Sequence, residues 1–509
     1  MNRHPESGQQ WAYIKFIWGN STNRIYLFFA LGVCIVQFEF FKVFYPCPDF
    51  FNDSFWYIYA ASHHMEINFW PIGYSKFLAL FHTLTHSDTA LIAFQYFFVQ
   101  LAALHFFFTI LYFFPTRHWV GSTIFIFLFC HPLTLYITNT IASDALFGAL
   151  TLLWLTELIW IIRRPQFHQL IIQAILFILC FTIRYNAYYF PIVSTIAILV
   201  SKQGVVKKIV GIALPVLLLV IYISYTRLEA YKCTGYYQFS ILTGWQLANN
   251  ALYIYDRIQI DTTRFPTEES REVNRISTNF FKGSDSTYLH DFLNGYESDY
   301  FIIQPESPLK QYYFKKQNEL EKIRGVYVWG VVSPAFESFG KSIILHHPLA
   351  YTRHFVIPNI GKYLIPSMSD IKQYNYGSSH IANLITKWFD YPQNNIYCKS
   401  FTFQKFLSIY QLLFLVLNCY FTLQFLLIIF KRKSLNFVRG EYTFYNLLAI
   451  FLLLNFLFTI VVVINVLRYQ YIPIDILFIG GLLMSGKISP SMLWKSGVYR
   501  RSTASQTSN

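Results

Sequence analysis

The stretch "YPCPDFFNDSFWYIYAASHHMEINFWPIGY", residues 45–74, decides how the rest of the chain is interpreted. A long apolar run precedes it and another follows it, so it lies where the chain leaves a membrane. It holds two carboxylates, Asp49 and Asp53, among many aromatic residues. Charged groups are costly at a bilayer unless they are paired or used, so these two residues become the first candidates for function.

The composition identifies the class of protein. The chain has 509 residues, a mean hydropathy of +0.36 and 13% charged residues. Soluble domains carry about a quarter charged residues, which excludes an ordinary soluble protein. The net charge is +14. In a membrane protein such an excess is typical of cytoplasmic loops and of contacts with anionic lipids, so we expect a lipid bilayer as partner and no nucleic acid.

The apolar runs predict ten membrane-spanning helices, since a span needs about 20 mostly apolar residues. They cover about 25–45, 89–114, 119–137, 143–162, 169–184, 187–201, 208–226, 403–430, 442–466 and 470–487. The fifth and sixth are short and share a polar turn, so either would be a broken or re-entrant helix. The expected fold class is therefore an all-α polytopic membrane protein, with a small extracytoplasmic domain inserted before the last three spans.

Basic residues in alternate short loops give the orientation. They place both termini in the cytoplasm and residues 45–74 outside. We expect an N-terminal membrane module over 1–226, an extracytoplasmic domain over 227–402, and C-terminal spans with a cytoplasmic tail over 403–509. The outer domain is predicted to be α-rich or α+β.

Two helices are predicted inside that domain, one starting at Thr267 and another over 307–332. Cys233 and Cys398 bracket the domain on the oxidising side of the membrane. They would close it with a disulfide or remain free thiols, and the sequence leaves both alternatives open.

The opening stretch itself predicts two helices that lie flat on the membrane surface. "NDSFWYIYAAS" forms the first, with Asp53 near its N-terminus, and "PIGYSKFLALF" forms the second after a sharp Pro-x-Gly turn. Asp53 either points at a cavity or simply caps its helix. Asp49 is equally consistent with a solvated loop residue.

Three further motifs put ionisable residues at the outer ends of spans. "SDALF" contains Asp144, "RYNAYYFP" begins with Arg184, and "LRYQYIPI" contains Arg468. Such residues are candidates for function by default, although snorkelling or pairing with a carboxylate would also explain the arginines. A basic segment around Arg353 approaches the membrane again before the eighth span.

Taken in order, these motifs resemble the GT-C superfamily of polytopic glycosyltransferases. The likeness is greatest to the bacterial relatives of protein O-mannosyltransferases and of the lipid A aminoarabinose transferase. It covers "DSFWYIYAA", "PIGY", "SDALF", "RYNAYYFP" and "LRYQYIPI", within about 1–226 and 403–487. The family turn usually continues as Gly-Tyr-Pro, whereas here Ser75 follows Tyr74.

The resemblance implies inverting transfer of a sugar from a polyprenyl-phosphate carrier to a lipid, glycan or protein acceptor. In the family position, Asp53 acts as general base, with Asp49 as second choice. Arginine pairs well with phosphate, so Arg468 and Arg184 would bind the carrier's phosphate. Tyr469, Asp144, His63 and Arg353 complete the expected substrate-binding residues. Some relatives use a divalent metal and others do not, and no ligand set in the sequence decides between them.

Two other functions compete with this hypothesis. A transporter or flippase usually places its ionisable residues near the middle of the membrane. An envelope polysaccharide polymerase also combines many spans with a large outer loop, but without an acidic first loop and two surface helices. The expected location is the bacterial inner membrane, with the active site on the periplasmic side.

Overall fold

The structure is a computed structural model that describes residues 5–283, 299–320, 325–462 and 465–488. Within these residues the chain is helical, and no β-strand forms apart from three isolated bridges. The predicted all-α class is confirmed at this level.

Eight helical segments are long and apolar enough to cross a membrane, so the chain is an integral multi-pass membrane protein by helix length and composition. They comprise α2 (Ser21–Phe44), α5 (Asp88–Phe113), α6 with α7 (His118–Cys130 and Leu133–Thr138), α8 (Asp144–Arg163), α11 (Val205–Thr234), α21 (Ile409–Phe430), α22 (Glu441–Val462) and α23 (Tyr471–Ile488).

The fifth and sixth predicted spans are shorter helices. They are α9 (Phe167–Ile183) and α10 (Phe190–Val200), joined by the 3-10 turn Tyr185–Tyr189. At 1.5 Å per residue, 11 residues reach about 16 Å, roughly half of a hydrocarbon core. The expected count of ten spans therefore stays a prediction. The short length of the fifth and sixth helices agrees with the sequence.

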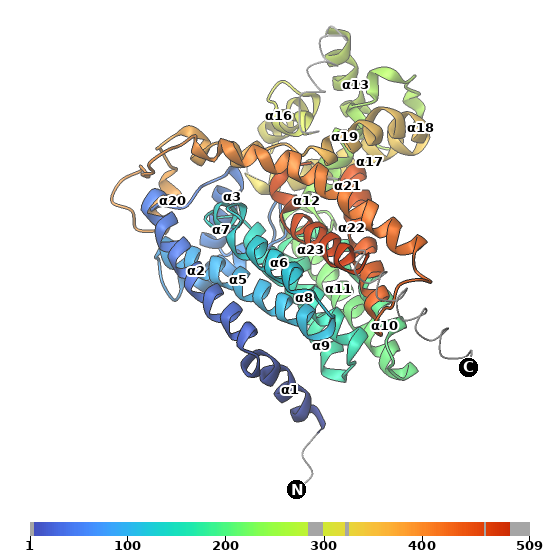
Figure 1. Cartoon of the computed structure of the whole chain (residues 1–509). Helices are drawn as coiled ribbons and strands as arrows, with labels where there is room; N and C mark the ends of the chain where they lie inside the picture. The colour runs from blue at the N-terminus through green and yellow to red at the C-terminus, as the bar shows by residue number, and fades with distance from the viewer. Residues whose placement is uncertain (1–4, 284–298, 321–324, 463–464, 489–509) are drawn as a thin grey trace, which may run out of the picture.

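The bundle is ordered by burial. In α8, 78% of the most apolar stretch is buried, whereas the corresponding fractions for α2 and α11 are 22% and 17%. Helix α8 therefore lies at the centre, and the exposed apolar side chains of α2 and α11 form the surface that would face lipid. Helix α1 (Pro5–Gly19) precedes α2 at the end of the bundle farthest from the outer helices (Figure 1).

A separate group of helices gathers at the opposite end of the bundle (Figure 1). It consists of α12 (Ile241–Leu252), α13 (Glu268–Gly283), α15 (Tyr300–Ile303), α16 (Pro308–Glu319), α17 (Val326–His346), α18 (Pro348–Tyr351) and α19 (Ile357–Leu364). Buried residues between Trp245 and Phe355 form its own apolar core. We call this group the outer unit.

One helix prediction in the outer unit is confirmed and one is wrong. Helix α13 follows Thr267, whose Oγ1 accepts a hydrogen bond from the Ser270 backbone N–H at 3.1 Å. Residues 307–332 do not form a single helix, because α16 ends at Glu319 and α17 begins at Val326. Gly325 precedes α17 with a φ of +62°, a conformation that interrupts a right-handed helix.

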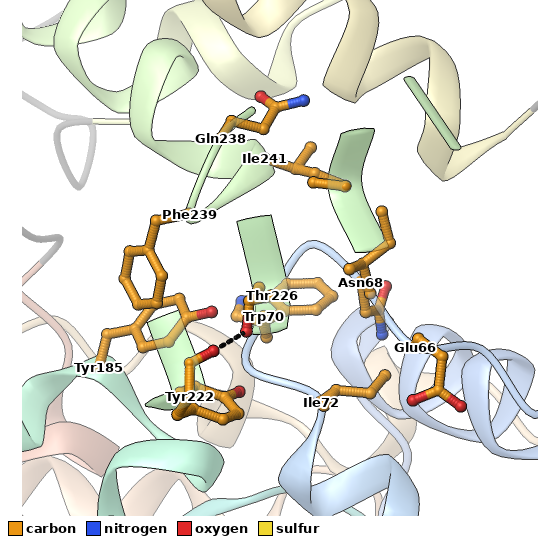
Figure 2. Close-up of a pocket in the computed structure, with 12 residues that line it drawn as sticks. Glu66, Asn68, Trp70, Ile72, Tyr185, Tyr222, Thr226, Gln238, Phe239 and Ile241 are labelled. Carbon is orange, nitrogen blue, oxygen red and sulfur yellow. Dashed lines mark hydrogen bonds between the residues drawn. The ribbon is translucent and has the colours of Figure 1, made fainter. Parts of the chain in front are cut away.

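The outer unit contacts α22 of the membrane bundle, where Tyr351 OH donates to Val461 O at 2.7 Å. Two further places also hold it to the bundle. Figure 2 shows the first, where the loop carrying Asn68 and Trp70 meets Thr226 of α11 and the approach to α12 at Gln238. A small apolar cluster that includes Phe69, Ala230 and Val326 seals this junction.

The second is the chain that follows the outer unit. Tyr374, Ile381 and Trp388 belong to the same buried core as the membrane helices, and α20 (Asn383–Trp388) lies near α3 (Figure 1). Cys398 is buried in this region, whereas Cys233 lies at the end of α11. All seven cysteines are described and free, so the Cys233–Cys398 disulfide is not formed.

Helices α12 and α17 pack closely where Gly244 of α12 faces Ser333 of α17. A Cβ at Gly244 would lie 1.9 Å from the carbonyl oxygen of Ser333, which is far inside contact distance. We predict that Gly244→Ala forces the helices apart and lowers the stability of the outer unit by about 1–3 kcal/mol, as overpacking usually does. A thermal unfolding midpoint in detergent measures the effect.

Gly361→Ala is the matched control, because no atom lies within 4 Å of its Cβ position in α19. It should be neutral or slightly stabilising, since alanine favours a helix by about 0.5–1 kcal/mol. Equal midpoints for the two variants would contradict the close crossing.

Candidate functional site

The surface helix α3 (Asn52–Ser62) presents Asp53 from its first turn. The residue that caps α3 is Phe51, and the Phe51 backbone N–H donates to Ser54 Oγ at 2.8 Å. Asp53 makes no capping hydrogen bond, so the interpretation of Asp53 as a simple cap does not hold. Its carboxylate is directed elsewhere.

Two isolated bridges bring distant parts of the chain together around Asp53. The Asp49 backbone N–H donates to Asn139 O at 2.8 Å, and the Ile141 N–H donates to Asp49 O at 3.1 Å. This bridge sets the start of α3 beside the start of α8. The second bridge joins Ser367 to Val466, which sets Asp370 beside Arg468.

Arg468 is the centre of the resulting cluster. Its Nη2 lies 2.6 Å from Asp53 Oδ2 and 3.0 Å from Asp370 Oδ2, and its Nη1 lies 3.2 Å from Asp144 Oδ2. Arg468 is buried, with 6% of its surface exposed. Three carboxylates from three parts of the chain therefore surround one enclosed guanidinium.

Arg184 extends the cluster on the other side. Its Nη1 pairs with Asp144 Oδ1. The guanidinium lies over the ring of Tyr469 at 4.1 Å, and Arg468 lies 4.9 Å from the same ring. Two guanidiniums and three carboxylates leave one formal negative charge in excess. Among these groups, burial raises the pKa of Asp53 above its ordinary value, because Arg468 only partly opposes the loss of solvation and Asp370 adds negative charge.

An apolar cavity of about 430 Å³ opens next to this cluster. It lies between the membrane helices and the outer unit, and aromatic and aliphatic side chains such as Trp70, Tyr188 and Phe458 form much of its wall. Asp53 and Arg184 are the charged residues among its described lining residues. The cavity thus has a large apolar body with one charged end.

Arg468 does not line the large cavity. Tyr469 does, and Arg468 lies behind Asp53 and Tyr469 with its guanidinium occupied by carboxylates. The prediction that Arg468 contacts phosphate therefore stays untested, and the observed arrangement is the alternative in which arginine pairs with carboxylates. Arg184 and Asp53 are the charged groups that a bound molecule would meet.

Asp144 is buried in the cluster and holds both arginines rather than facing the large cavity. Asp49 is also buried, at 3% exposure, and its Oδ1 accepts from the Asn375 backbone N–H at 2.7 Å. It is not a solvated loop residue. Its contacts fasten the loop before α3, which gives it a structural place beside the cluster.

The structure does not bring His63 and Arg353 to the cluster. His63 follows α3 at its far end, where its ring stacks on Tyr59 at 4.2 Å and is exposed. Arg353 is exposed on the short π-helical turn Thr352–Val356. Neither lines the cavity.

Sequence reasoning missed Asp370. It lies in the segment after the outer unit, where Tyr376 OH donates to Asp370 Oδ1 at 2.8 Å. The motif "SMSDIK" that contains it resembles an ordinary loop, and nothing in its composition signals a partner 98 positions along the chain. Tyr57 lines the cavity, and its hydroxyl donates to Ser143 Oγ at 3.1 Å. The sequence marked it only as one aromatic residue of a motif and not as a candidate site residue.

Within the described residues, no group of three or more His, Cys, Asp or Glu side chains is arranged to hold a metal ion. The three carboxylates of the cluster do converge, but the guanidinium of Arg468 occupies the position between them. The cluster therefore does not fit a divalent metal at this point.

No protein-family model matches the chain, and neither the curated proteins nor the solved structures include a significant match.

The cluster predicts a strong dependence of stability on Arg468. In Arg468→Gln, three carboxylates would remain close together without their cation, and breaking a buried ion pair usually costs about 3–5 kcal/mol. We expect a large drop in the thermal unfolding midpoint. Arg275→Gln removes an exposed arginine 3.7 Å from Glu272 and should change the midpoint little. Similar midpoints for both variants would contradict the central role of Arg468.

We expect the buried Asp49 carboxyl to make the free energy of unfolding depend on pH. Burial raises the pKa of Asp49 from 3.8 to about 7. The folded protein thus keeps a proton that the unfolded chain loses, so the free energy of unfolding should fall as pH rises from about 4 to about 7. In Asp49→Asn this contribution disappears, while the amide oxygen still accepts from Asn375.

The variant should therefore unfold at a higher temperature than the wild type at pH 8, by a few degrees, and the difference should shrink toward pH 4. Asp390→Asn, at an exposed position, serves as control. Parallel pH profiles for the wild type and Asp49→Asn would exclude Asp49 as the source.

Proposed function

We propose that the protein is an inverting glycosyltransferase that takes a sugar from a polyprenyl-phosphate carrier. The observation that carries this proposal is the position of Asp53 and Arg184 at the charged end of an apolar cavity. A lipid-phosphate sugar has the matching shape and chemistry, since it joins an apolar chain, an anionic phosphate and a polar sugar.

In the proposed reaction, the acceptor hydroxyl attacks the anomeric carbon of the sugar. Asp53 takes the proton from that hydroxyl as the new glycosidic bond forms. The bond between the anomeric carbon and the phosphate oxygen breaks, and the electron pair leaves with the phosphate. Arg184, which lines the same cavity, offsets the charge that develops on this leaving group.

Arg468 has a different part in this proposal. It contacts Asp53 at 2.6 Å and lies outside the wall of the large cavity, so it acts as a positioning residue. It holds the Asp53 carboxylate toward the cavity and keeps Asp144 in contact with Arg184. Tyr469 lines the cavity beside Arg184, and the guanidiniums of Arg184 and Arg468 both lie against its ring.

The proposal extends to family and location. We infer membership of the GT-C superfamily, ten spans, both termini in the cytoplasm, and a site on the periplasmic face of a bacterial inner membrane. The position of the charged cluster at one end of the bundle supports chemistry at a membrane surface. A transporter or flippase would be expected to place such groups near mid-membrane.

Transfer by the purified protein in lipid vesicles tests the proposal. A membrane extract supplies the acceptor, and radiolabelled polyprenyl-phosphate sugars supply the donor. Asp53→Asn should lower the rate of transfer by about 10²–10⁴, the usual contribution of a general base. Asp390→Asn should leave the rate unchanged, because Asp390 is exposed and pairs with His86 away from the cavity.

Two outcomes would overturn the proposal. Undiminished transfer by Asp53→Asn would remove Asp53 from the reaction. Movement of the labelled lipid between leaflets without transfer would favour a flippase instead.

A further inference from the structure

Helix α12 forms the wall of the cavity that belongs to the outer unit. Thr243, Gln246 and Asn250 lie three and four residues apart along α12, so they share one face of the helix. All three line the cavity, and Ser240 lies just before them. The membrane side of the cavity is largely apolar, whereas this side carries a row of polar groups.

The row is held in place by hydrogen bonds. Gln246 Nε2 donates to Asn250 Oδ1 at 2.8 Å, and Asn250 Nδ2 donates to Tyr351 OH at 3.3 Å. Tyr351 OH in turn donates to the Val461 carbonyl oxygen at 2.7 Å, at the end of α22. The chain of bonds fixes the amide of Gln246 in the wall of the cavity, which Thr243 also lines.

The row carries no charge. Among the described lining residues, the charged groups are Asp53 and Arg184, at the cluster. A site built from amides and hydroxyls binds neutral donors and acceptors, and it offers nothing to compensate the charge of an ammonium or a carboxylate. Ligand sites commonly combine apolar walls with a few placed polar groups of this kind.

We infer that the α12 wall binds an uncharged, hydroxyl-rich sugar, with Thr243 and Gln246 as specificity-determining residues. This inference rests on the proposed function, because it assigns the glycosyl group of the transferase substrate to this wall. The same chemistry fits the sugar of the donor or a sugar on the acceptor. An amino sugar or a uronic acid is disfavoured.

Direct binding tests the inference without turnover. The wild-type protein in nanodiscs is titrated with three probes in the absence of acceptor: polyprenyl phosphate, a polyprenyl-phosphate neutral hexose and a polyprenyl-phosphate amino sugar. The wild type should bind the neutral hexose more tightly than the other two. Gln246→Leu should weaken hexose binding by about three- to tenfold, as expected for loss of a neutral hydrogen bond, and leave polyprenyl phosphate unaffected.

Two other variants sharpen the result. Gln246→Glu adds a negative charge to a side chain of nearly the same size and shape. It should shift the binding preference from the neutral hexose toward the amino sugar. Gln311→Leu, at an exposed position of α16 outside the cavity wall, is the control and should change none of the affinities. Thr243→Val tests the hydroxyl separately, since its side chain keeps nearly the same shape.

The outcomes separate the two proposals. If the wild type fails to bind polyprenyl phosphate at all, the proposed function fails. If it binds polyprenyl phosphate but the neutral sugar adds no affinity, and Gln246→Glu changes no preference, the inference about the α12 wall is overturned while the transferase proposal stands. In the transfer assay, a higher KM for a glycan acceptor in Gln246→Leu, with hexose-donor binding unchanged, assigns the wall to the acceptor sugar.

Discussion

The buried guanidinium of Arg468 is the constraint on which the outer half of the molecule depends. A charge removed from water costs several kcal/mol unless partners replace its hydration. Asp53, Asp144 and Asp370 supply that replacement. They come from the first outer loop, the start of α8 and the segment after the outer unit, so one cation fixes the relative positions of three distant parts of the chain.

The two backbone bridges explain how these parts arrive. Asp49 pairs with the strand-like turn before α8, and Ser367 pairs with the turn before α23. Each bridge lies four residues or fewer from a carboxylate or guanidinium of the cluster. The short extended contacts therefore set which residues of the paired segments lie opposite one another. The ion pairs with Arg468 then stabilise that pairing. A shift of one residue in either bridge would aim Asp53 or Asp370 away from Arg468.

The sequence predicted what hydrophobicity and local pattern control. Eight of the predicted apolar runs correspond to helices long enough to span a membrane, a helix forms at "NDSFWYIYAAS" as predicted, and Thr267 precedes α13. The position of α3 on a membrane surface stays a prediction. Sequence motifs also selected Asp53, Asp144, Arg184, Arg468 and Tyr469, which the structure brings together. What these residues do stays a proposal.

The rest depended on contacts that no local pattern encodes. Asp370 lies in a loop without periodicity, and only the Ser367–Val466 bridge reveals its partner. His63 and Arg353 were selected for their chemistry alone. His63 lies at the opposite end of α3 from Asp53, and both side chains are exposed away from the cluster. The break at Gly325 was missed because a glycine between two helical patterns also occurs within helices, and only its φ distinguishes the two cases.

The net charge of the cluster explains, in the proposed reaction, why proton uptake by Asp53 accompanies departure of the phosphate. Before reaction, three carboxylates exceed two guanidiniums, so one carboxylate can accept a proton at low cost. In the proposal Asp53 is that carboxylate, because it lines the cavity, whereas Asp144 and Asp370 do not. Once Asp53 has taken the acceptor's proton, the cluster is neutral just as negative charge appears on the leaving phosphate. Repulsion between the base and the product is thereby removed in the same step that creates the product, and Arg184 remains beside it to stabilise the new charge.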